Sequence, residues 1–207
     1  MNMIFKNAMI AMAMIMSANT VFAQNGNGNA ANAQQVTVEN DLDAKYATNL
    51  LKAGTVAPEI ALKTIDGKQF SLKSLRGKYV VVDFWASWCP DCRKDAPNVV
   101  AMYNKFHKKG VEFVGVSFDT KSESWKSAVE KLGIPYTQVS DMKNMRESPV
   151  ALAYNIKWIP TAYVIDPEGK VVLATVMSQK VDAYLTSVYP NDTYNRHIAH
   201  MVQAVQR

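Results

Sequence analysis

The feature that most constrains the fold is an unbroken run of β-branched and aromatic residues at 79–84, YVVVDF. A run of this kind, with no alternation of polar residues, is typical of a central strand buried on both faces. Its single charged residue is Asp83, and the pair Cys89 and Cys92 follows within a few residues. Gly110 ends a helical pattern at 93–109, so the sequence predicts a buried strand that turns into a helix at the cysteines.

Further strands and helices alternate along the rest of the chain. A turn at Asp66-Gly67 predicts a β-hairpin, and a Pro-Glu-Gly turn at 167–169 predicts a second one. Ser122 or Ser124 is expected to cap a helix that runs through Trp125. The pattern predicts an α/β sandwich with a mixed central sheet. The expected strands are 60–62, 69–72, 111–118, 136–140, 161–165 and 170–176, and the expected further helices are 125–132, 149–154 and most of 182–207.

Length and composition exclude several classes of protein. The chain has 207 residues, of which 48% are hydrophobic, and this fits one globular domain with extra residues at its ends. Its 23 basic and 18 acidic side chains give a net charge of +5, but the basic residues are scattered rather than clustered. The sequence therefore excludes wholesale disorder and argues against a nucleic-acid partner.

The N-terminus has the pattern of an export signal. Lys6 precedes an apolar stretch at 8–18, and the small residue Ala23 precedes the expected cleavage site. The stretch is shorter than the roughly 20 apolar residues that span a bilayer. We expect residues 1–23 to be a signal peptide and the mature protein to be periplasmic or otherwise exported. Beyond it we expect a flexible leader at 24–53, one domain at 54–188 and a helical tail at 189–207.

The two cysteines are the only ones in the chain, so a framework of structural disulfides is impossible. Placed at the start of a helix, Cys89 would lie where unpaired N–H groups favour a thiolate, and Cys92 would lie one turn inward. Pro90 suits the first helical position, which needs no N–H partner. The spacing predicts one exposed nucleophilic sulfur, that of Cys89, and one buried resolving sulfur, that of Cys92.

A cysteine pair with this spacing also occurs in structural zinc sites and at sites of covalent haem attachment. A structural zinc site needs four ligands, and the three histidines are not spaced to supply the missing two. Covalent haem attachment needs a histidine directly after the second cysteine, where this chain has Arg93. We therefore expect no metal and no cofactor other than a redox-active Cys89–Cys92 disulfide.

The segment 82–93, VDFWASWCPDCR, resembles the active-site segment of the thioredoxin superfamily, and Trp158-Ile159-Pro160-Thr161 resembles its cis-proline loop. The export signal and the residues around Gly133-Ile134-Pro135 resemble the TlpA/ResA-like branch, whose domain is of the AhpC/TSA type. The match covers about 56–188. It implies a thioredoxin-like three-layer α/β sandwich with an N-terminal β-hairpin and a central strand-helix insertion.

The resemblance implies an enzyme, a thiol-disulfide oxidoreductase in which Cys89 attacks a substrate disulfide and Cys92 resolves the mixed disulfide. Asp83 matches the buried acid of thioredoxins and would accept the proton of Cys92. The alternative for Asp83 is a carboxylate at the end of a strand, in contact with water.

The same resemblance implies a substrate groove and partners. A cis Pro160 would place the backbone of Ile159 where a substrate segment can pair as an added strand. Trp88 and Trp158 would wall the groove beside Cys89, and Pro90 would also bind the substrate. The implied partners are exported proteins with disulfides, apocytochromes c among them, and a membrane thiol protein that donates electrons.

The direction of the reaction rests on Asp91. A negative charge between the two cysteines should raise the pKa of the Cys89 thiol and favour a reductase. The alternatives are a disulfide oxidase or isomerase, a thiol peroxidase, and a non-catalytic binding module. The peroxidase pattern needs Thr or Ser where this chain has Ala86 and Pro where it has Val82.

Overall fold

The computed structural model describes residues 41–190. The predicted signal peptide at 1–23, most of the predicted leader and the predicted tail beyond Pro190 lie outside this part of the chain. Within the described residues, no helix has the length and the apolar character needed to cross a membrane.

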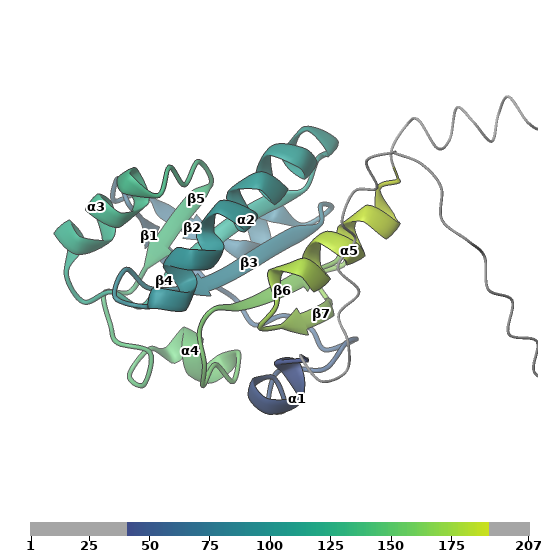
Figure 1. The fold of residues 1–207 in the computed structure, drawn as a ribbon, viewed down its shortest axis with the longest axis horizontal. Coiled ribbons are helices and arrows are strands. Elements are labelled where there is room, and N and C mark those ends of the chain that lie inside the picture. Colours follow the sequence, from purple (N-terminus) through teal and green to yellow (C-terminus); the bar gives the residue numbers. More distant parts are fainter. Residues whose placement is uncertain (1–40, 191–207) are drawn as a thin grey trace, which may run out of the picture. The chain divides into compact units, whose positions relative to one another are not determined.

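Seven strands form one mixed sheet in the order β2-β1-β5-β4-β3-β6-β7 (Figure 1). The predicted hairpin around Asp66-Gly67 is confirmed, since β1 and β2 pair antiparallel across it. The second hairpin is confirmed as well, between β6 and β7. The strands are β1 Ala61–Thr64, β2 Gln69–Ser71, β3 Val80–Trp85, β4 Glu112–Ser117, β5 Thr137–Ser140, β6 Thr161–Ile165 and β7 Val171–Thr175.

Strand β3 lies inside the sheet and is buried along its whole length, as the unbroken apolar run predicted. It pairs in parallel with β4 and antiparallel with β6. In the second pairing Phe84 lies opposite Thr161. The end of β3 that leads to the cysteines therefore lies beside the start of β6, directly after Pro160.

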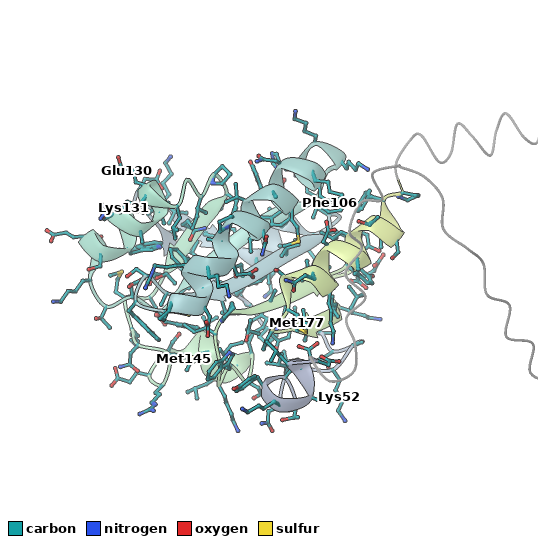
Figure 2. The ribbon with its side chains drawn as sticks, viewed as in Figure 1. Lys52, Phe106, Glu130, Lys131, Met145 and Met177 are labelled. Atoms are coloured by element: carbon teal, nitrogen blue, oxygen red, sulfur yellow. A yellow bond between two sulfur atoms is a disulfide. The ribbon has the colours of Figure 1, made fainter. Side chains whose placement is uncertain are left out.

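Helices cover both faces of the sheet. On one face α2 (Pro90–Phe106) and α5 (Ser178–Val188) lie side by side (Figure 1). Phe106, labelled in Figure 2 at the end of α2, is fully buried. Side chains alternate along a strand, so Phe84 points to the face opposite Asp83. There it packs on Tyr154, which follows α4 (Pro149–Ala153). The predicted three-layer α/β sandwich is confirmed.

Helix boundaries differ from the predictions at two places. Helix α3 (Ser122–Lys131) begins directly after Lys121, and no side chain caps it. The predicted cap by Ser122 or Ser124 is wrong, because both serines already lie inside the helix. Helix α5 starts at Ser178, four residues before the predicted position, and the hydroxyl of Ser178 donates to Asp95 of α2.

The N-terminal segment 41–57 lies against β7. Three backbone hydrogen bonds join residues 54–57 to 169–171, at the outer edge of that strand. A short helix, α1 (Asp43–Tyr46), precedes them, and the Asp43 carboxylate accepts hydrogen bonds of 2.8 Å from the Thr175 hydroxyl and the Val176 amide. Lys180 Nζ lies 2.6 Å from the same carboxylate. Residues 41–53 fall in the expected leader, and here they contact the domain.

These contacts make Asp43 a measurable contributor to stability. Asp43→Ala leaves the buried Thr175 hydroxyl and an amide without their acceptor, so we expect the free energy of unfolding to fall by about 1–3 kcal/mol. Urea unfolding followed by circular dichroism measures this loss. The matched control is Asp182→Ala, which removes an exposed ion pair with Lys105 and should change stability by less than about 1 kcal/mol. Equal losses in the two variants would contradict the anchoring role of Asp43.

Candidate active site

The cysteine pair lies at the N-terminus of α2, at the end of the loop that follows β3. Cys89 is the residue that caps the helix, with extended backbone angles, and its sulfur accepts the amide of Cys92 at 3.1 Å. Pro90 occupies the first helical position, as predicted. The two sulfurs form a disulfide, with the Cα atoms 5.3 Å apart. The helix N-terminus therefore directs an N–H group at the sulfur that the sequence predicts to be the nucleophile.

The two sulfurs lie in different surroundings, although both residues are buried. Cys89 is only 4% exposed in this disulfide form, so the expectation of an openly exposed sulfur is wrong. It lies in an outer groove, where flanking residues of the groove cover most of its surface. Cys92 instead lines an inner cavity beside Asp83. Only Cys89 faces the side from which a substrate can approach.

The outer groove has a volume of about 700 Å³. The Ile159–Pro160 peptide bond is cis, as the resemblance implied, and the Ile159 carbonyl oxygen lies 3.7 Å from Cys89 Sγ. Trp88 and Trp158 both line the groove and are 54% and 37% exposed. The structure thus brings Trp88, Pro90 and Ile159 together in the groove, with two exposed aromatic rings beside the reactive sulfur. Pro160, which sequence analysis also assigned to substrate binding, lines the inner cavity instead.

Met145, Arg146 and Glu147 also line this groove, from the connection between β5 and α4. Figures 1 and 2 share one view, and Met145 in Figure 2 is labelled in the same part of that view as α4 in Figure 1. The two methionines of the stretch 141–146 are compatible with either an adaptable loop near the groove or simple packing, and the structure places Met145 in the groove. Arg146 and Glu147 carry no local signal of their own, because only the folding of a distant connection brings them to Cys89.

Asp83 lies behind the cysteine pair. It is 8% exposed, and the hydroxyl of Tyr136 donates to its carboxylate at 3.0 Å. Burial away from water raises the pKa of Asp83 to about 7, against the opposing effect of the Tyr136 hydrogen bond. The alternative of a carboxylate in open contact with water is wrong. With Cys92 and Pro160, Asp83 lines a cavity of about 10 Å³, roughly the space of one water molecule.

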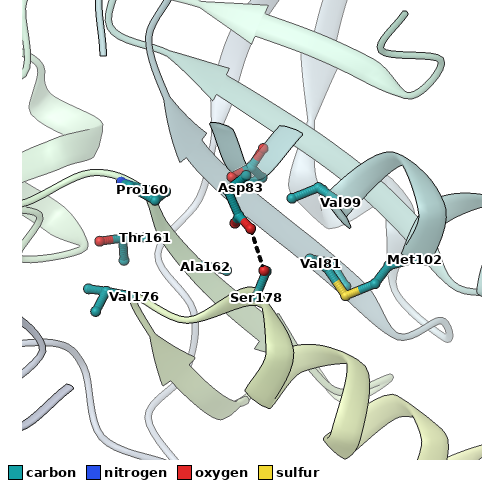
Figure 3. A pocket seen from close by; sticks show the side chains of 10 residues that line it. Val81, Asp83, Val99, Met102, Pro160, Thr161, Ala162, Val176 and Ser178 are labelled. Atoms are coloured by element: carbon teal, nitrogen blue, oxygen red, sulfur yellow. Dashed lines mark hydrogen bonds between the residues drawn. The ribbon is translucent and has the colours of Figure 1, made fainter. Parts of the chain in front are cut away.

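A second carboxylate, that of Asp95, lines the same cavity. It comes from α2, three residues after Cys92 and thus on the same face of the helix. The Ser178 hydroxyl donates to it at 2.6 Å, the bond that is dashed in Figure 3. The negative charge of Asp95 contributes to the raised pKa of Asp83. Sequence analysis missed Asp95, although its spacing from Cys92 was a usable signal.

Asp119 fixes the loop that carries the first cysteine. This residue is 2% exposed, and its carboxylate accepts hydrogen bonds from the Ser87 amide at 2.9 Å and from the Ser117 hydroxyl at 2.7 Å. The guanidinium of Arg93 donates to the Ser87 carbonyl at 2.7 Å. Sequence analysis missed Asp119 as well. The sequence did contain a signal for Asp119, which is an acidic residue directly after a predicted buried strand. An acidic residue in a buried run was also what drew attention to Asp83.

The described residues hold no cluster of three or more His, Cys, Asp or Glu side chains arranged to bind a metal ion. What the arrangement can do chemically is exchange disulfides. One sulfur is reachable from the groove, a second can displace it, and carboxylates behind the second can take up a proton.

Comparison with known proteins agrees with this chemistry. The sequence model of the AhpC/TSA family matches residues 53–174. The thiol-disulfide oxidoreductase ResA of Bacillus subtilis is 30% identical over 146 residues, which are 69% of this chain and 79% of ResA. ResA of Geobacillus kaustophilus is 30% identical over 140 residues, which are 66% of this chain and 78% of that protein.

Solved structures give the same result for the fold. The thioredoxin domain of a thiol-disulfide oxidoreductase from Bacteroides vulgatus is 35% identical, with a TM-score of 0.62 over 67% of this chain and 98% of that one. A thiol:disulfide interchange protein from Bacteroides sp. is 33% identical, with a TM-score of 0.64 over 72% and 98% of the two chains. The thioredoxin-like fold expected from the sequence is confirmed.

The raised pKa of Asp83 makes stability depend on pH. The folded protein holds this proton up to about pH 7, whereas an unfolded chain releases it near the ordinary value of 3.8. The folded state therefore binds more protons between these values, and stability should fall as pH rises from about 4 to about 7 and then level off. Three pKa units correspond to about 4 kcal/mol at most.

Asp83→Asn should remove this dependence, because an amide does not ionise and can still accept the Tyr136 hydrogen bond. We expect the oxidised variant to match wild type near pH 4 and to exceed it by up to about 4 kcal/mol at pH 8. Urea unfolding at the two pH values measures both. Asp182→Asn, at an exposed site, is the control. If wild type and Asp83→Asn lost stability equally between pH 4 and 8, the buried proton would have to lie elsewhere.

Proposed function

We propose a reductase function for this chain, which belongs to the AhpC/TSA family and is a thiol-disulfide oxidoreductase of the ResA-like kind. In this proposal the reduced Cys89/Cys92 pair opens disulfides in exported proteins and is itself left as the Cys89–Cys92 disulfide. The family gives the class of reaction. The direction of electron flow and the place where it happens are the proposal.

The observation that carries the direction is the placement of acids around the sulfurs. Asp83 and Asp95 line the cavity behind Cys92, and Asp91 follows Cys89 by two residues in the first turn of α2. Negative charge disfavours thiolates but leaves an uncharged disulfide unaffected. Oxidation of the pair relieves this repulsion, so the reduced protein should give up its electrons readily.

Two features oppose this effect, and both act on Cys89. The Cys92 amide points at its sulfur, and the Arg93 guanidinium is held near the loop that precedes it. They keep enough thiolate at Cys89 for attack on a substrate. The carboxylates of the inner cavity lie beside Cys92 and disfavour its thiolate. We therefore assign the reducing character of the pair mainly to this buried sulfur.

The proposed reaction balances within the pair and the substrate. The Cys89 thiolate attacks one sulfur of a substrate disulfide, and the other substrate sulfur leaves as a thiolate that takes up a proton. Cys92 then loses its proton and attacks Cys89, which releases the second substrate sulfur. Two protein thiols become one disulfide, and one substrate disulfide becomes two thiols.

Asp83 is the proposed acceptor of the Cys92 proton. With a pKa of about 7, its carboxylate is available as a base at neutral pH and can return the proton without a large penalty. The space of about 10 Å³ between these groups suits transfer through one water molecule. Asp95 supports this role because its charge helps to hold the pKa of Asp83 near the working pH.

Location and partners follow from the sequence. The predicted signal peptide at 1–23 would direct the chain to the periplasm or another exported compartment, with cleavage near Ala23. An oxidising compartment returns such a pair to the disulfide, so a reductase there needs a continuing electron supply. We propose a membrane thiol protein as that donor. The proposed substrates are exported proteins with disulfides, apocytochromes c among them.

The reduction potential of the Cys89/Cys92 couple tests the direction. We expect a value near or below about −220 mV, toward that of thioredoxin at about −270 mV. Titration of the purified protein in buffers of reduced and oxidised dithiothreitol or glutathione gives the value, with Cys92→Ser as the control that cannot form the disulfide. A value near about −120 mV would make the protein an oxidant and overturn the proposal.

The proton acceptor has its own test. Asp83→Asn should slow the reduction of a protein disulfide at pH 7 by at least about ten-fold and should remove an inflection near pH 7 from the pH–rate profile. Stopped-flow tryptophan fluorescence of the reduced protein mixed with oxidised substrate measures the rate. A variant as fast as wild type, with the same pH profile, would reject Asp83 as the acceptor.

A further inference from the structure

One wall of the outer groove is supported by a part of the chain that lies outside the family match. The Trp158 ring, which lines the groove, stacks on the ring of Tyr46, with centroids 4.1 Å apart and planes inclined by 20°. Tyr46 is the last residue of α1, whereas the AhpC/TSA match begins at residue 53. The support therefore comes from residues before those that the family model matches.

The position of Tyr46 is fixed from several directions. Asp43, at the start of α1, binds the Thr175 hydroxyl, the Val176 amide and Lys180. The ammonium group of Lys45 lies 4.9 Å from the centre of the Tyr46 ring. The contacts of Asp43 tie α1 to the end of β7 and the start of α5. Tyr46 is thus held in place rather than resting on Trp158 by chance.

The partner ring is held as well. The carbonyl of Trp158 accepts the Thr161 hydroxyl at 2.6 Å, and the next residue, Ile159, is 6% exposed. Backbone and ring together set where Trp158 projects. Because Tyr46 stacks on this ring, the remaining exposed surface of Trp158 is the part available to the groove.

The groove beside this ring suits an apolar side chain. Trp88, Pro90 and Met145 line it together with Trp158, and the charged residues Asp91, Arg146, Glu147 and Lys157 also border it. Trp88 and Trp158 are among the few large apolar side chains that stay exposed in the described residues. An aromatic or large aliphatic side chain of a substrate would cover these surfaces and remove them from water.

We propose that Tyr46 is a positioning residue that holds Trp158 as an apolar platform beside Cys89, and that the platform favours polypeptide disulfides flanked by an aromatic or large aliphatic residue. This proposal rests on the proposed function, because it names the kind of substrate that the same site prefers. It assigns the preference to α1, a segment before the family match.

The test compares two peptides in single-turnover reactions of the reduced, full-length protein. Each peptide carries one cysteine as a mixed disulfide with glutathione, flanked by Phe in one peptide and by Ser in the other. The reaction oxidises the two protein thiols to a disulfide and reduces the mixed disulfide to peptide thiol and glutathione, so no further reductant is needed. Wild type should reduce the Phe peptide with the higher kcat/KM.

Tyr46→Ala should lower kcat/KM for the Phe peptide by roughly three- to ten-fold, the usual size of one aromatic contact, and should act mainly on KM. The Ser peptide, the small substrate 2-hydroxyethyl disulfide and the reduction potential should stay at wild-type values. Tyr46→Phe should restore the preference, because the ring provides the stacking. Tyr184→Ala, at a half-buried tyrosine of α5, is the matched control and should keep the preference.

Three outcomes would overturn the proposal: wild type reduces both peptides equally well, Tyr46→Ala keeps the full preference, or Tyr46→Phe loses it as Tyr46→Ala does. Each of them leaves the reductase function standing. Failure of the proposed function looks different, since the reduced wild-type protein would then reduce neither the peptides nor 2-hydroxyethyl disulfide.

Discussion

The pairing of β3 with strands on both sides is the constraint on which the site depends. Parallel β4 on one edge and antiparallel β6 on the other bury the whole strand and fix its register. This register sets where the chain leaves the sheet for Cys89 and where it enters again after Pro160. Two loops far apart in the sequence therefore meet at the same end of the sheet, where the connection between β5 and α4 completes the groove.

Burial of β3 also sets the electrostatics of the site. A strand covered on both faces keeps a carboxylate away from bulk water, so Asp83 keeps its proton to near neutral pH. The hydroxyl of Tyr136 prevents a still larger shift, and the charge of Asp95 adds to it. One residue type, aspartate, thus has different roles at different depths. Asp83 is the proposed proton acceptor behind the cysteines, whereas Asp119 holds the loop that carries them.

The sequence predicts the parts of the site that lie close together along the chain. A buried strand, a cysteine pair at a helix start and a proline loop before another strand are local patterns, and the structure places Cys89, Cys92 and Pro160 as they imply. Contacts between distant segments were not predictable. Neither Tyr136 against Asp83 nor Tyr46 against Trp158 leaves a trace in spacing or periodicity, because each pair meets only when the sheet is assembled.

Helix ends and the start of the domain were hard to predict for the same reason, because they too depend on contacts between distant segments. Residues 41–53 carry only a weak helical pattern around 46–51 and are expected to be leader, yet the contacts of Asp43 with β7 and α5 bind them to the domain. Leu50 and Leu51, in the same segment, also pack against the core. Neither a side chain that satisfies a buried hydroxyl and an amide nor two adjacent leucines form a periodic pattern, so the sequence does not reveal this attachment.

The N-terminal segment has one more consequence, for the behaviour of the protein in a crowded compartment. In the described residues, β7 is the last strand on its side of the sheet, and the backbone of residues 54–57 occupies part of its outer edge. An open edge offers unpaired N–H and C=O groups to any other extended chain. In the proposed function, the protein meets polypeptide substrates, which can offer such extended chains. By pairing its own backbone with the start of β7, the chain removes part of this edge from strand addition. The other edge of the sheet is β2.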